Sequence, residues 1–178
     1  MLLMFHVYIL LNLVSVNGMG AGICPISKYR NKIYVLLGKE RFNDNWSDFG
    51  GSRDGNETPF STAVREGYEE LDGFFGTKKE FKNMVIANFI EKIDNGKNYH
   101  SYLTKFEFDK NLPFYFNNHH KFIENKTKNL CGKNGLYEKS EIRWFSIEEL
   151  KTLENIRPHY SIIISTIILM SEDLLYIL

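Results

Sequence analysis

The sequence has few cysteines, few prolines and no net charge. Its two cysteines, Cys24 and Cys131, form neither a disulfide framework nor a metal-binding pattern, and we expect both to be small buried apolar residues. The 22 basic and 22 acidic side chains cancel, so no overall field attracts nucleic acid, and we expect no stable DNA binding. An anionic ligand therefore has to be held by a local arrangement of residues.

The apolar start of the chain is short for a membrane span. The uncharged run at residues 1–16 is shorter than the roughly 20 residues that cross a bilayer, and it lacks the basic start of a signal peptide. We predict an extension at residues 1–18 and one domain at 19–178, with a signal or anchor as the alternative. The glycosylation sequon at 56–58, inside the segment that carries the candidate site, favours a cytoplasmic location over secretion.

Apolar runs bounded by turn residues predict the strands of a sheet. Strands are expected at 20–27, 32–40, 83–93, 98–108 and 141–147, with a turn and a short strand at 43–51. The Asp-Asn-Gly turn at 94–96 joins two of these runs into an antiparallel hairpin.

The remaining segments predict helices and one loop. Segment 112–135 is mixed and polar, which predicts a helical turn followed by an exposed loop, and 148–153 predicts a short helix. The segment 157–170 predicts a C-terminal helix that starts behind Pro158. Its apolar residues predict burial against the sheet, with a homodimer interface as the alternative. The order of elements predicts a mixed β-sheet covered by helices, either an α+β fold or an α/β sandwich.

One helix is marked by its own residues. Thr58 is suited to cap a helix N-terminus, and Pro59 then occupies the first helical position, where its missing N–H costs nothing. At about 100° per residue, one apolar stripe follows from the spacing of Phe60, Ala63, Val64, Gly67 and Leu71. This stripe is suited to packing on a sheet.

Three glutamates lie beside that stripe. Glu66, Glu69 and Glu70 have the spacing i, i+3, i+4, which makes their carboxylates neighbours that repel one another. Mg²⁺ prefers oxygen ligands of this kind and can bridge phosphate oxygens. Two adjacent glycines, Gly50 and Gly51, allow the backbone to approach a ligand closely.

The spacing of these residues resembles a known signature. It reads as a glycine, five residues, a glutamate, seven residues, then Arg-Glu-x-x-Glu-Glu, at Gly51, Glu57, Arg65, Glu66, Glu69 and Glu70. This resembles the Nudix box of the Nudix hydrolase superfamily, and the flanking segments extend the resemblance over residues 20–170. The resemblance implies the Nudix type of α/β/α sandwich. It also implies hydrolysis of a diphosphate linked to another moiety, by attack of water at phosphorus with Mg²⁺ or Mn²⁺.

The resemblance also implies roles for residues. Glu66, Glu69 and Glu70 would hold metal, with Glu57 as an organiser or outer metal ligand. Arg65 would orient a glutamate through a salt bridge, so Glu66, Glu69 and Arg65 form the predicted catalytic group. Gly50, Gly51 and Arg53 are the candidates for substrate binding.

Two positions depart from the family pattern, and both lie near the end of the helix. Gly67 stands where the family has a small aliphatic residue, which costs roughly 0.5–1 kcal/mol in a helix interior relative to alanine. Asp72 stands where the family has a glycine, and Gly73 follows it. Neither departure removes a predicted ligand.

Residues outside the box leave alternatives open. The family often takes its catalytic base from a later loop, where Glu138 and Glu141 are the candidates, with exposed surface charge as the other interpretation. For His119 and His120 an exposed loop pair is favoured over phosphate binding. A set of aromatic residues could stack a base or belong to the core: Tyr99, Tyr102, Phe114 and Phe116.

The amino-acid sequence of residues 48–70 also resembles that of Nudix proteins of large DNA viruses. Among these proteins are mRNA-decapping enzymes and diphosphoinositol polyphosphate hydrolases. We therefore predict a hydrolase of a nucleoside diphosphate derivative, with capped RNA as one candidate substrate. A diphosphoinositol polyphosphate hydrolase and a binding module without catalysis are the alternatives.

Overall fold

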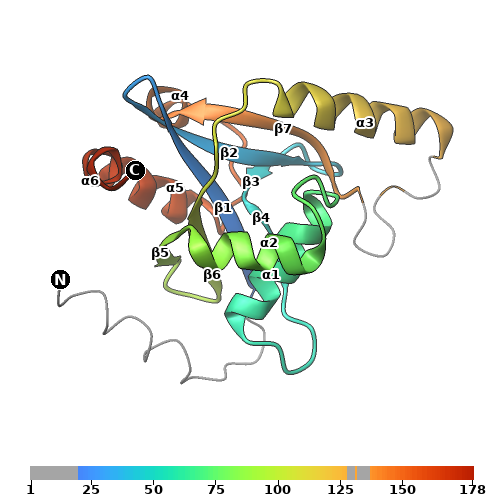
Figure 1. Ribbon diagram of the computed structural model, residues 1–178, viewed down its shortest axis with the longest axis horizontal. Coiled ribbons are helices and arrows are strands. Elements are labelled where there is room, and N and C mark those ends of the chain that lie inside the picture. Colours follow the sequence, from blue (N-terminus) through green and yellow to red (C-terminus); the bar gives the residue numbers. More distant parts are fainter. Residues whose placement is uncertain (1–19, 128–130, 132–136) are drawn as a thin grey trace.

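The structure, a computed structural model, describes residues 20–127, 131 and 137–178 (Figure 1). The predicted extension at 1–18 and most of the predicted loop after residue 127 lie outside these residues, so both stay predictions. Within the described part, no helix combines the length and apolar character that crossing a membrane requires.

The described strands form one mixed sheet of seven strands. Its central order is β3-β2-β1-β6-β5, with β4 paired to β1 and β7 paired to β2. β1 runs parallel to β6 and antiparallel to β2 and β4. The strand bounds are Gly20–Tyr29 (β1), Lys32–Glu40 (β2), Trp46–Ser47 (β3), Phe49–Ser52 (β4), Phe89–Asp94 (β5), Tyr99–Lys105 (β6) and Lys139–Ser146 (β7).

Helices cover both faces of this sheet, as the predicted sandwich requires. One apolar cluster joins the sheet to α1, α2 and α3, and a second joins its other face to α4, α5 and α6 (Figure 1). The helix bounds are Pro59–Glu70 (α1), Lys78–Ala87 (α2), Leu112–Lys126 (α3), Ile147–Lys151 (α4), Ser161–Leu169 (α5) and Ser171–Ile177 (α6). The predicted fold class is confirmed.

The central strand shows why both faces are buried. Side chains alternate along a strand, so Ile23 belongs to the cluster under α1 while Cys24 and Ile26 belong to the cluster under α5. The antiparallel pairing of β1 with β4 brings Gly22 opposite Gly50 and Ala21 opposite Gly51. The loop that leaves β4 leads directly into α1, so this edge of the sheet positions the predicted site.

Three predictions from the sequence need correction. Residues 83–87 are the end of α2 rather than the start of a strand, because a capping box at Thr77 and Glu80 starts a helix there. Residues 112–126 are a full helix rather than a helical turn. Cys24 is buried as expected, whereas Cys131 is half-buried.

Candidate active site

The box helix begins where the sequence predicts. The Thr58 hydroxyl accepts a hydrogen bond from the Ser61 N–H at 3.1 Å, and Pro59 is the first residue of α1. Ala63, Val64 and Leu71 of the predicted apolar stripe are buried against the sheet, and Phe60 is half-buried. The opposite side of α1 is thereby left for the polar residues.

Gly67 lets α1 lie very close to β1. A Cβ atom added at Gly67 would stand 2.8 Å from Cγ1 of Ile23 and 3.1 Å from its Cβ. A real Cβ atom essentially never lies within 3.0 Å of such a neighbour, so a larger residue would push the helix away from the strand. This close approach is the physical reason for the first departure from the family pattern.

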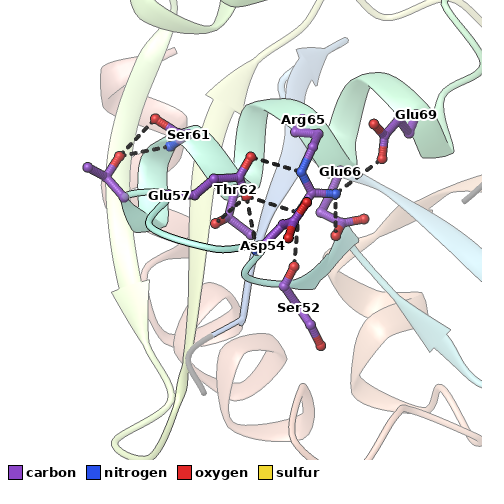
Figure 2. Close-up of polar contacts among 9 residues, drawn as sticks. Ser52, Asp54, Glu57, Ser61, Thr62, Arg65, Glu66 and Glu69 are labelled. Atoms are coloured by element: carbon purple, nitrogen blue, oxygen red, sulfur yellow. Dashed lines mark hydrogen bonds and ion pairs between the residues drawn. The ribbon is translucent and has the colours of Figure 1, made fainter. Parts of the chain in front are cut away.

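Arg65 lies at the centre of three glutamates (Figure 2). Its Nε and Nη2 donate to the two carboxylate oxygens of Glu57 at 2.9 and 3.0 Å. Its Nη1 donates to Glu66 at 2.8 Å and to Glu69 at 3.2 Å. Nη2 also donates to the carbonyl oxygen of Ser52, at 2.9 Å, which ties the helix to the end of β4. The hydrogen bonds from Arg65 lower the pKa of Glu57 below its usual value, so Glu57 is held as an anion.

Glu66 extends over the predicted glycine. A Cβ atom added at Gly51 would stand 2.6–2.7 Å from the carboxylate atoms of Glu66, so any larger residue there would force this carboxylate to move. Burial raises the pKa of Glu66, the neighbouring charges of Glu69 and Glu138 add to the rise, and Arg65 opposes it. Burial is therefore the main reason for the raised pKa, and Arg65 outweighs each of the two neighbouring glutamates.

Glu70 turns inward, away from Arg65, and contacts a buried lysine. Lys139 is fully buried, and its Nζ lies 2.6 Å from Glu40, 3.4 Å from Glu70 and 3.0 Å from the Ser47 hydroxyl. Oε2 of Glu70 is buried and has no hydrogen-bond partner in the described structure, so its contact with Lys139 is electrostatic rather than directional. Burial raises the pKa of Glu70 well above its usual value, although the Lys139 charge opposes this.

Glu138 lies close to this group, just before β7. Its charge contributes to the raised pKa values of both Glu66 and Glu70. Glu141, the other candidate base, lies within β7 opposite Lys39 of β2. Of the two candidates, Glu138 is therefore the one that the structure brings to the carboxylates of α1.

Asp72, the second departure from the family pattern, has a structural partner. It adopts a positive φ of 49°, the region that a glycine occupies without strain, and its carboxylate binds Nε2 of His120 on α3. His120 is 1% exposed and stacks on Phe116. The prediction of an exposed histidine pair is thus wrong for His120, because the aspartate at the end of the box holds it inside.

The predicted substrate-binding residues differ in their surroundings. A Cβ atom at Gly50 would stand 2.1 Å from the Tyr99 hydroxyl, which donates at 2.6 Å to buried Asp48. Gly50 is therefore required by packing beneath Tyr99. Gly51 and Arg53 are half-buried, and the Arg53 Nε is buried with no partner in the described structure. Tyr99, Tyr102 and Phe116 belong to the core, whereas Phe114 is exposed.

The carboxylate oxygens of this site are suitable ligands for a hard cation, but they are not arranged around one common point. Among residues 20–127, 131 and 137–178, no three His, Cys, Asp or Glu side chains are grouped to hold a metal ion. The reason is that Arg65 lies between Glu57, Glu66 and Glu69, while Glu70 faces Lys139. All the donors are carboxylate oxygens, the ligands that Mg²⁺ and Mn²⁺ prefer, and Oε2 of Glu70 accepts no hydrogen bond within the described part of the chain.

A separate cavity of about 1260 Å³ is lined by residues of β1, α2, β6 and α3, among them Lys28, Met84, Lys105 and Tyr115. None of the predicted catalytic or metal-binding residues lines it. The cavity is therefore distinct from the carboxylate site.

Three solved structures resemble this protein over most of its length. A Nudix hydrolase from M. smegmatis, RenU, is 14% identical with a TM-score of 0.53, and the match covers 87% of this chain and 86% of that one. The C. elegans Ap4A hydrolase is 16% identical with a TM-score of 0.51, covering 88% and 97%. A bifunctional NMN adenylyltransferase/ADP ribose pyrophosphatase from Francisella tularensis is 16% identical with a TM-score of 0.53, covering 92% of this chain and 44% of that one.

Comparisons with protein-family models and with curated protein sequences give no match. The structural likenesses show that this chain has the fold of Nudix hydrolases, as the spacing of its box residues predicts.

Proposed function

We propose that this protein is a pyrophosphohydrolase of the Nudix type that uses Mg²⁺ or Mn²⁺ to cleave a diphosphate linkage in a nucleoside diphosphate derivative. One observation carries the proposal: on this fold, Arg65 gathers Glu57, Glu66 and Glu69 around the turn from β4 into α1, with Gly51 directly beneath Glu66. A solvated acidic helix face has no need of a glycine under one carboxylate and a shared arginine between three.

The proposal assigns a role to each part of the site. Glu66, Glu69 and Glu70 would hold the cation, with Glu57 supporting them through Arg65 rather than directly. When bound, the cation neutralises phosphate charge and makes a water molecule more acidic. Glu138, whose charge acts on Glu66 and Glu70, would accept the proton of the water that attacks phosphorus. Gly51 and Arg53 would contact the diphosphate.

The substrate follows from charge and from resemblance. The resemblance of residues 48–70 to viral Nudix proteins makes capped RNA one candidate, and we propose that the protein acts on a phosphorylated small molecule or on such a cap. A diphosphoinositol polyphosphate is the second candidate, yet it requires a dense set of free cations. The cations among these carboxylates, Arg65 and Lys139, are already paired with glutamates, which favours the nucleotide.

A substrate panel tests the proposal. Nucleoside diphosphate derivatives, capped RNA and diphosphoinositols are incubated with Mg²⁺ or Mn²⁺, and products are resolved by chromatography beside Glu69→Gln. We expect hydrolysis of at least one nucleotide that chelation abolishes and that the variant loses by about 100-fold, the upper end for a residue that supports a metal site. Equal behaviour of wild type and variant on every compound would leave the binding-module alternative.

A further inference from the structure

We propose that Arg41 is a positioning residue for Glu138: it fixes the backbone on both sides of this glutamate and thereby sets where the carboxylate lies relative to α1. This inference rests on the proposed function, in which Glu138 is the general base. Arg41 follows β2 directly and is 97 positions away from Glu138 in the chain, so the box signature does not include it.

Arg41 binds three consecutive carbonyl groups. Its backbone N–H donates to the carbonyl oxygen of Glu138 at 3.0 Å, and its Nε donates to that of Tyr137 at 2.9 Å. Its Nη2 lies 3.5 Å from the carbonyl oxygen of Lys139. The rigid fork of donors on the guanidinium reaches two of these carbonyls, those of Tyr137 and Lys139 on either side of Glu138, without losing its planar geometry.

The strand ladder is irregular at the same point. Lys39 pairs with Glu141 and Glu40 pairs with Lys139, so Ser140 is an extra residue on β7. Such bulges bend a strand and redirect its side chains, and they weaken the regular pairing that would otherwise fix the backbone. The contacts from Arg41 supply at Glu138 the restraint that the ladder lacks.

Arg41 is itself held by α3 and by the end of the box. Its side chain is 10% exposed, and its Nη1 lies 3.5 Å from Glu124. Its Nη2 lies 3.4 Å from Nδ1 of His120, whose Nε2 binds Asp72. Because arginine can only donate, Nδ1 of His120 accepts, and the ring donates to Asp72 through Nε2. The aspartate that replaces the family glycine thus connects the end of α1 to the segment that presents Glu138.

A double-mutant cycle tests the inference on any substrate that the wild type hydrolyses. Arg41→Ala should lower kcat by about 10- to 100-fold with KM changed less than about threefold, because misplacing a catalytic group by about 1 Å has effects of that size. In the background of Glu138→Gln the same change should alter kcat by less than about twofold, since the group to be positioned is gone. An equal loss in both backgrounds overturns the inference.

The matched control is Glu124→Gln. It removes the exposed ion pair of Arg41, whose glutamate side chain is 54% exposed, and leaves the carbonyl contacts in place, so kcat should not change. Arg41→Gln replaces the alanine variant if that variant does not fold.

Hydrogen exchange decides the structural part without any substrate. Amides of residues 138–142 should exchange at least tenfold faster in Arg41→Ala than in wild type or in Glu124→Gln. Exchange at the wild-type rate overturns the inference even if no substrate is found. Wild type that hydrolyses nothing on the panel, together with fast exchange in Arg41→Ala, contradicts the proposed function and leaves the restraint by Arg41 intact.

Discussion

Arg65 and Lys139 neutralise acidic residues in two very different settings. The Arg65 side chain is 18% exposed and shares its donors among partly exposed carboxylates, whereas Lys139 is fully buried between Glu40 and Glu70. Ion pairs open to water contribute about 0–1 kcal/mol, while removing one partner of a buried pair costs about 3–5 kcal/mol. The comparison teaches that the adjacent carboxylates Glu69 and Glu70 differ in setting: Glu69 shares a partly exposed guanidinium, whereas Glu70 faces a fully buried ammonium.

The largest expected effect is on the buried side. Lys139→Met should lower the free energy of unfolding by about 3–5 kcal/mol, because Glu70 keeps its burial and loses its cation, while Glu40 retains Arg157 at 3.1 Å and the Ser47 hydroxyl at 3.0 Å. Urea denaturation measures the change. Lys39→Met is the control, since Lys39 pairs with exposed Asp44 and should change stability by less than about 1 kcal/mol. Similar losses in the two variants would contradict the comparison.

A buried acid that is held by hydroxyl groups sharpens the comparison. Asp48 accepts hydrogen bonds from Tyr99 and Ser101, both at 2.6 Å, and burial raises its pKa to about 6. The folded protein therefore binds a proton that the unfolded chain releases from about pH 4, and stability is lost as the pH rises through this window. The shift of about two units corresponds to about 3 kcal/mol.

Asp48→Asn removes that titration. The free energy of unfolding of wild type relative to this variant should rise by up to about 3 kcal/mol between about pH 7 and pH 4. Urea titrations at several pH values measure the difference, which also cancels the contributions of other carboxylates. Parallel curves for the two proteins would show that Asp48 ionises normally.

The smallest expected effect on stability is at Arg65, where activity should respond instead. Arg65→Lys keeps the charge and loses the fork that reaches three glutamates, so stability should fall by about 1 kcal/mol or less. Hydrolysis should fall by about 10- to 100-fold, as for other residues that orient metal ligands. Unfolding and kinetics measured on the same preparation check both. A stability loss as large as that of Lys139→Met would remove the contrast.

Local patterns predicted the parts of the fold that neighbouring residues determine. Thr58 and Pro59 placed the start of α1, and apolar runs bounded by turn residues placed β1 and β2 within two residues of their ends. The same reasoning failed at residues 83–87, where an apolar run was taken for a strand. The capping box at Thr77 and Glu80, ten residues before Ala87, was the signal that could have identified the helix.

The inward half of the site was beyond such reasoning. Glu40 and Lys139 are 99 positions apart, and lysine is almost never fully buried, so nothing local marks them as a pair. The roles of Arg41 and Asp72 likewise depend on contacts with segments that are distant in the sequence. The box residues could be found because one helix and one turn bring them together, whereas their supports come from four elements that only folding unites.

The closeness of α1 to β1 has a consequence for any attempt to bring this chain toward the family pattern. A methyl group at Gly67 would meet Ile23, 44 positions earlier, so Gly67→Ala is tolerable only alongside a smaller residue at position 23. Positions 23 and 67 are far apart in the sequence, yet a substitution at one requires a compensating substitution at the other. The contact between Gly67 and Ile23 therefore helps to set the distance between the sheet and the helix that carries the glutamates.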